Sequence, residues 1–136
     1  MQLFTKSIYE SRPTNDILAI SVMSRHTLSN GWLPDPKIKP DAYHLWVPDL
    51  APPDKLLRRW YQQPQGISPE EFTALYFTHL EQQPQKDTLD LLLELVLTTH
   101  RQPTLLCVEP TGQFCHRRLL AQRCAELEPR LQVVHQ

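Results

Sequence analysis

The chain has little glycine, little cysteine and no long apolar run. Its 136 residues include 3 glycines against 13 prolines, and 3 cysteines. So few cysteines, in an odd number, fit reduced thiols in the cytoplasm better than a disulfide framework. No apolar stretch approaches the roughly 20 residues that cross a bilayer, so we expect no membrane segment. The first ten residues have no charged segment followed by an apolar one, so we expect a cytoplasmic protein rather than a secreted one.

An excess of basic charge is also absent. The chain has 14 lysines and arginines against 15 acidic residues, a formal net charge of -1. A general nucleic-acid binder carries a positive excess, so the composition gives no strong nucleic-acid signal. With 40% hydrophobic and 21% charged residues, the composition is that of a globular domain. At this length we expect a single domain, residues 1–136.

Strand-like and helical patterns alternate along the chain. Short apolar runs predict strands at 17–23, 43–47, 104–108 and 131–135, and a weaker alternation at 3–9 indicates an edge strand. Apolar residues at helical spacing predict helices from about 50, 68 and 87, and a last helix from 115–117 to 126. Ser68 is the predicted N-cap of the second helix, with Glu71 closing a capping box. This alternation predicts an α/β fold with a largely parallel sheet covered by helices.

The stretch 104–121 contains most of the predicted site. A strand ends there, a turn rich in proline and glycine follows, and a helix then opens. Ligands of parallel sheets gather at the C-terminal ends of strands, and the strand at 17–23 brings Arg25 to that edge. The candidate site residues in the stretch itself are Cys107, Glu109, Cys115, His116 and Arg117.

Cys115 is the candidate nucleophile or redox thiol. It precedes a helix and stands beside His116 and Arg117, and both the helix terminus and the positive charge favour a thiolate. The alternative is a small buried residue that packs the turn. Glu109 could act as a general base or pair with Arg117 to hold the loop.

Arg25 and Arg117 are the predicted anion-binding pair, because a guanidinium offers a planar fork of donors to a phosphate or carboxylate. Cys107 adjoins this site. It could form a disulfide or share a metal with Cys115, but core packing is the simpler interpretation. No C-x-x-C pair supports zinc, so we predict no metal, and no pattern indicates a cofactor.

The spacing C-V-E-P-T-G-Q-F-C-H-R-R-L-L-A resembles the family known as domain of unknown function 488, in its short, YeaO-like bacterial and archaeal form. Its strand ends in Cys-x-Glu and its helix opens on Cys-His-Arg. Trp46, the Leu-Ala-Pro run at 50–52, and Phe72 with Tyr76 also match, so the resemblance covers roughly residues 20–125. Where relatives carry Trp-Pro-Arg-Gly, this chain continues from Arg25 as R-H-T-L. The resemblance implies a single-domain, Rossmann-like fold and no established activity.

Two functions from different classes fit these residues. The first is an enzyme that handles a small molecule or nucleotide through a phosphate or carboxylate group. The second is a binding module for an anion or a nucleic acid, in which Cys-His-Arg is structural. The sequence favours the first by a narrow margin and leaves the oligomeric state open.

Overall fold

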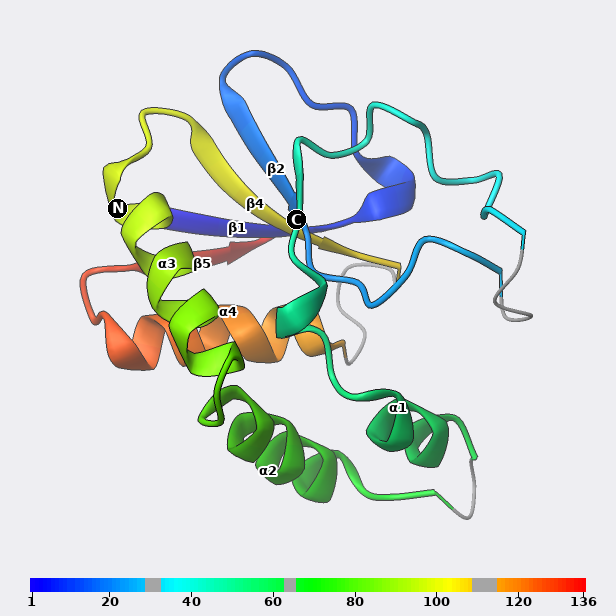
Figure 1. Ribbon diagram of the computed structural model, residues 1–136. Helices are drawn as coiled ribbons and strands as arrows, with labels where there is room; N and C mark the ends of the chain where they lie inside the picture. Colours follow the sequence, from blue (N-terminus) through cyan, green and yellow to red (C-terminus); the bar gives the residue numbers. More distant parts are fainter. Residues whose placement is uncertain (29–32, 63–65, 109–114) are drawn as a thin grey trace.

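The computed structural model describes residues 1–28, 33–62, 66–108 and 115–136. Its strands form one sheet of five in the order β3-β2-β4-β1-β5, and every neighbouring pair is parallel. The strands are β1 (Gln2–Ser7), β2 (Ile17–Ser21), β3 (Leu45–Trp46), β4 (Gln102–Cys107) and β5 (Gln132–His135). Figure 1 shows the sheet with helices packed beneath it. The predicted α/β, Rossmann-like fold with a parallel sheet is confirmed.

The first strand is not an edge strand, and that prediction is wrong. β1 lies between β4 and β5, with Phe4 opposite Thr104 on one side and Val134 on the other. Leu3 and Thr5 are both fully buried. Polar Thr5 on a covered strand weakened the hydrophobic signal, whereas the actual edges are the short strands β3 and β5.

The helices are α1 (Asp54–Tyr61), α2 (Pro69–Leu80), α3 (Gln85–Thr98) and α4 (His116–Leu127), with short 3-10 turns η1 (Ile8–Glu10) and η2 (Pro48–Leu50). The predicted cap of α2 is confirmed, because the Ser68 hydroxyl accepts from the Glu71 amide at 3.1 Å. The Glu71 carboxylate contacts Arg59 of α1 at 3.1 Å. Among the described helices, none has the length and apolar character needed to span a membrane.

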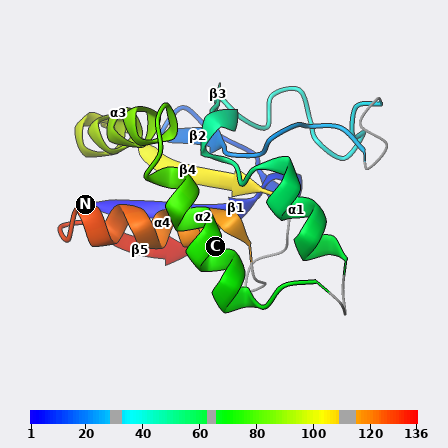
Figure 2. The same cartoon turned by 60° about the horizontal axis from the view of Figure 1, so that its bottom comes forward.

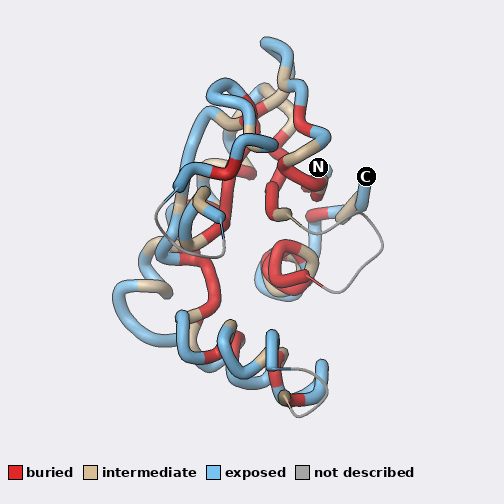
Figure 3. The backbone as a smooth tube through the Cα atoms, turned by 90° about the vertical axis from the view of Figure 1, so that its right-hand side faces the viewer, coloured by how far each residue is buried: buried red, intermediate tan, exposed pale blue. Residues whose placement is uncertain are grey.

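The two faces of the sheet are covered differently. On one face, Leu3, Ile20 and Leu105 pack against apolar residues from all four helices. On the other face, Ala19 and Leu106 pack against η1 and the irregular segment around Ile38 and Tyr43. Figure 2 shows α3 and α4 lying along the sheet, and Figure 3 shows the buried residues gathered along the strands and on the inner sides of the helices. The helices therefore all lie on one side of the sheet, and a loop covers the other side.

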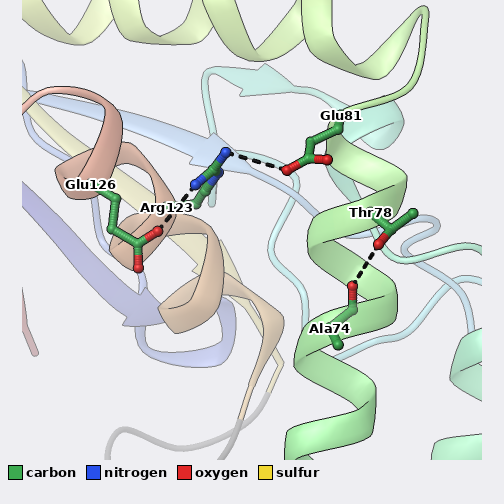
Figure 4. Close-up of polar contacts among 5 residues, drawn as sticks. All are labelled: Ala74, Thr78, Glu81, Arg123 and Glu126. Carbon is green, nitrogen blue, oxygen red and sulfur yellow. Dashed lines mark hydrogen bonds and ion pairs between the residues drawn. The ribbon is translucent and has the colours of Figure 1, made fainter.

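Arg123 of α4 joins this helix to the end of α2. Its guanidinium lies 3.5 Å from Glu81, the C-cap of α2, and 3.2 Å from Glu126 on α4 (Figure 4). It also stands over the Phe77 ring, 5.7 Å from the ring centroid. These contacts help to fix α4 relative to α2.

Candidate functional site

The site lies where the central strands end and α4 begins. Cys107 is the last residue of β4, directly opposite Ser7 at the end of β1. Val22 follows β2, and its amide donates to the Leu106 carbonyl at 3.1 Å. Cys115 is the N-cap of α4, and His116 is the first residue of that helix. Because all these strands are parallel, their C-terminal ends meet at one edge, as predicted.

Cys107, His116 and Val22 form a hydrogen-bonded chain. The Cys107 sulfur lies 3.6 Å from Nδ1 of His116, and Nε2 of His116 lies 2.8 Å from the Val22 carbonyl oxygen. A carbonyl can only accept, so Nε2 carries a proton and donates it. In the neutral ring Nδ1 is then the acceptor for the thiol proton. The ring is also held from the side by Tyr76, whose ring meets it edge-on at 6.1 Å.

Tyr76 is itself fixed by a buried hydrogen bond, because its hydroxyl donates to the Leu50 carbonyl at 2.6 Å. Burial raises its pKa well above the ordinary value, so the hydroxyl stays protonated and keeps donating. The imidazole of His116 therefore has one defined tautomer and one defined orientation.

Arg117 and Cys115 form a second pair next to the first. The Nη1 group of Arg117 donates to the Cys115 sulfur at 3.4 Å. Arg117 is fully buried, and among the described residues no group accepts from its Nε or Nη2. A buried guanidinium with unsatisfied donors is costly, so the arginine lowers stability where it lies.

A cavity of about 750 Å³ opens over the Cys107–His116 pair. Cys107, Val108 and His116 line one part of it. The remaining lining comes from the segment after β2, from α1, and from the loops that carry Tyr9 and Asp35. Those residues are Tyr9, Met23, Ser24, Arg25, Thr27, Leu28, Asp35, Asp54, Leu57, Arg58 and Tyr61. A space of this size suits a small molecule rather than a macromolecule.

Two arginines and two acids face this cavity. Arg25 and Arg58 are exposed, and so is Asp54. The buried Asp35 accepts from the Tyr9 hydroxyl at 2.6 Å and from the Lys37 amide at 2.9 Å. The Tyr9 hydrogen bond is the main reason that the pKa of Asp35 falls below its usual range. The lining can therefore bind an anionic group and a polar group of one ligand at the same time.

His26 does not line the cavity but packs beside it. Its ring stacks on Tyr43 at 4.6 Å and meets Trp46 at 4.5 Å, and its Nε2 lies 2.6 Å from the Ser21 hydroxyl. Trp46 in turn donates to the Met23 carbonyl at 2.7 Å. Burial lowers the pKa of His26, which keeps this stacked histidine neutral near pH 7. These contacts fix the segment that carries Arg25.

The structure brings some of the predicted site residues together and separates others. Cys107, His116 and Arg25 line the cavity. Cys115 and Arg117 are buried and do not line it. Glu109 lies outside the described residues, and its predicted roles stay predictions.

Sequence reasoning missed Arg58 and Tyr61 of α1. Arg58 and its neighbour Arg59 are both exposed on α1. The missing information was where α1 packs, because helical spacing shows which side is apolar but not which cavity the polar side borders.

Cys107, Cys115 and His116 are the described residues that could hold a metal ion. Their ligand atoms all lie within 4.8 Å of one another, and all three residues are buried. The two sulfur atoms are therefore close neighbours as well.

Comparison with protein-family models gives a match over most of the chain. Residues 3–127 match the family model DUF488-N3a, described as the active DUF488-N3 subclade. No curated protein and no solved structure matches the chain.

Proposed function

Because this chain belongs to the domain of unknown function 488 family, which carries no activity to transfer, we propose its function from the site: it is an enzyme that acts on a small molecule bearing a phosphate or carboxylate. Cys107 is the proposed nucleophile and His116 its general base. The matching subclade is described as active, which fits a catalytic role.

The observation that carries the proposal is the chain of contacts from Cys107 through His116 to Val22, at 3.6 and 2.8 Å. A nucleophile activated by a base, with that base oriented by a third group, is the recurring arrangement of covalent catalysis. The Val22 carbonyl takes the orienting place that a carboxylate holds in the familiar triads. It fixes the tautomer and stabilises the imidazolium that forms when the thiol gives up its proton.

The proposed step follows from these positions. The Cys107 proton moves to Nδ1 of His116, and the thiolate attacks an electrophilic carbon of the bound molecule. The bond to the leaving group breaks, and the leaving group takes the proton from Nδ1. His116 keeps its Nε2 hydrogen bond to Val22 throughout, so the ring need not turn between the two proton transfers.

Arg25 and Arg58 support the anionic substrate class. Both border the cavity that Cys107 lines, and guanidinium groups recognise phosphates and carboxylates with paired hydrogen bonds. Asp54 borders the same cavity, and its negative charge disfavours a ligand that is anionic over its whole surface.

The proposal is tested with two thiol reagents that differ only in charge. Iodoacetate is an anion and iodoacetamide is neutral, and the ratio of their rates at Cys107 measures how well the cavity attracts an anion. We expect this ratio to fall by about 3- to 10-fold in the double variant R25Q/R58Q, since a cleft lined with charge concentrates ions of opposite sign. The matched control D54N should raise the ratio. R118M, which alters a cation outside the cavity lining, should leave it unchanged.

Two results would overturn the proposal. A ratio that is unaffected in R25Q/R58Q would remove the anionic substrate class. A Cys107 that reacts with neither reagent would favour the binding-module alternative, in which these residues hold the fold and no chemistry takes place.

A further inference from the structure

Each of two neighbouring thiols has its own basic partner. Cys107 faces Nδ1 of His116 at 3.6 Å, and Cys115 accepts from Arg117 at 3.4 Å. Their sulfur atoms lie within 4.8 Å of each other. Cys124, the third cysteine, has no such setting. It lies in the helix-facing core, and burial raises its pKa to about 12.

We propose that Cys107 and Cys115 are a redox couple, in which Cys107 reacts with a hydroperoxide that enters the cavity and Cys115 resolves the product as a disulfide. This inference rests on the proposed function, because it needs a reactive Cys107. It goes further by giving Cys115 and Arg117 a role that the first proposal does not use.

Access separates the two roles. Cys107 lines the cavity and Cys115 does not, so a reagent in the cavity meets Cys107 first. Both residues are almost fully buried, Cys107 at 2% exposed and Cys115 at 3%, so the cavity lining is what separates them. The Cys115 sulfur lies within 4.8 Å of the Cys107 sulfur, in place to attack an oxidised Cys107. A disulfide needs a sulfur–sulfur distance of about 2.05 Å, and the two sulfurs start from within 4.8 Å of each other.

The chemistry balances in two steps. The Cys107 thiolate attacks the distal oxygen of the hydroperoxide, the O–O bond breaks, and the released alkoxide takes the proton held on His116. Cys107 is thereby oxidised by two electrons to a sulfenic acid. The Cys115 thiolate then attacks the Cys107 sulfur, the S–O bond breaks, and hydroxide leaves and takes up a proton to become water. A dithiol reductant restores both thiols by exchange.

Arg117 explains why Cys115 suits the second step. A guanidinium that donates to a sulfur favours the thiolate, which is the attacking form. Disulfide formation removes that negative charge and leaves Arg117 buried without it. The reduced state is thereby favoured, and we expect the disulfide to be easily reduced again.

The test uses the full chain, reduced and then treated with hydrogen peroxide, with remaining thiols alkylated before peptide mapping by mass spectrometry. We expect one disulfide between Cys107 and Cys115, which dithiothreitol reverses. C115S should instead accumulate a sulfenic acid at Cys107 that dimedone traps. C107S should form no disulfide, and C124S, the matched control, should behave as the unaltered chain does.

The outcomes separate this inference from the proposed function. If Cys107 is alkylated rapidly but peroxide yields no Cys107–Cys115 disulfide, the redox couple is refuted and the nucleophile stands. If Cys107 is inert to both, the two proposals fail together. One zinc ion bound per chain that protects both thiols from peroxide would also refute the couple, because the sulfurs would then be metal ligands.

Discussion

Replacing Arg117 by methionine should make the protein more stable. Arg117 is fully buried, and two of its donor groups, Nε and Nη2, have no acceptor among the described residues. An unsatisfied buried donor costs about 1–3 kcal/mol, and more when it is charged. The substitution also loses the contact from Nη1 to the Cys115 sulfur, which is worth about 1.5–3 kcal/mol if the sulfur is a thiolate. We therefore expect a net gain of about 1–3 kcal/mol in the free energy of unfolding, within the range seen when buried ionic groups are replaced by apolar ones.

Thermal and urea denaturation at pH 7 measure this change. For 136 residues the entropy of unfolding is about 0.29 kcal/mol/K, so the expected gain raises Tm by about 3–10 °C. The control is R118M, which changes the neighbouring, partly exposed arginine of α4 and should shift stability by no more than about 0.5 kcal/mol. A loss of more than about 1 kcal/mol in R117M would refute the reasoning, because it would mean that the arginine is a satisfied structural element. A gain would instead indicate that Arg117 is retained for function at a cost in stability.

Two further predictions concern the fold around the site. Burial lowers the pKa of His26, so as the pH falls the unfolded chain takes up a proton at a higher pH than the folded chain does. The contribution of His26 to stability should therefore be fully present above about pH 6.5 and be lost as the pH drops below it. H26Q should make the melting temperature depend less on pH in thermal melts between pH 5 and 7.5. If the melting temperature of H26Q changes with pH as steeply as that of the unaltered chain, other histidines account for the dependence. S68A should lower the free energy of unfolding by about 1 kcal/mol, because the Glu71 amide loses its cap. T78A removes a hydroxyl that donates to the Ala74 carbonyl of its own helix (Figure 4), and it should have almost no effect. An equal loss of stability in S68A and T78A would argue against the cap.

Local chemistry explains what could be predicted from the sequence. Ser68 before a proline and an acid is a cap signal that depends on nearby residues alone, and the structure confirms it. The meeting of Arg25, Cys107 and His116 follows from one further assumption, that the strands are parallel. Parallel strands place their C-terminal ends at one edge, so residues distant in sequence converge there.

The remaining features depend on packing between distant segments. The central place of β1 requires pairing with β4 and β5, both about a hundred residues or more away, and nothing in residues 3–9 encodes those partners. The sequence likewise placed two cysteines at the site without showing which of them faces the cavity. Which cysteine faces the cavity depends on the direction of a side chain at a strand end and on the position of α1. Arg58 and Tyr61 of that helix also line the cavity.

The central claim is that His116 activates Cys107, and per-residue alkylation rates test it most directly. The measurement is the rate constant of iodoacetamide at each cysteine at pH 7, obtained by quenching and peptide mapping, in the unaltered chain and in H116Q. The account predicts that Cys107 reacts at least about 100-fold faster than Cys124, because burial raises the pKa of Cys124 to about 12 and leaves almost no thiolate there. It also predicts that H116Q slows Cys107 by about 10-fold or more and leaves Cys124 unchanged. Equal rates at the two cysteines, or a Cys107 rate that does not change in H116Q, would contradict it.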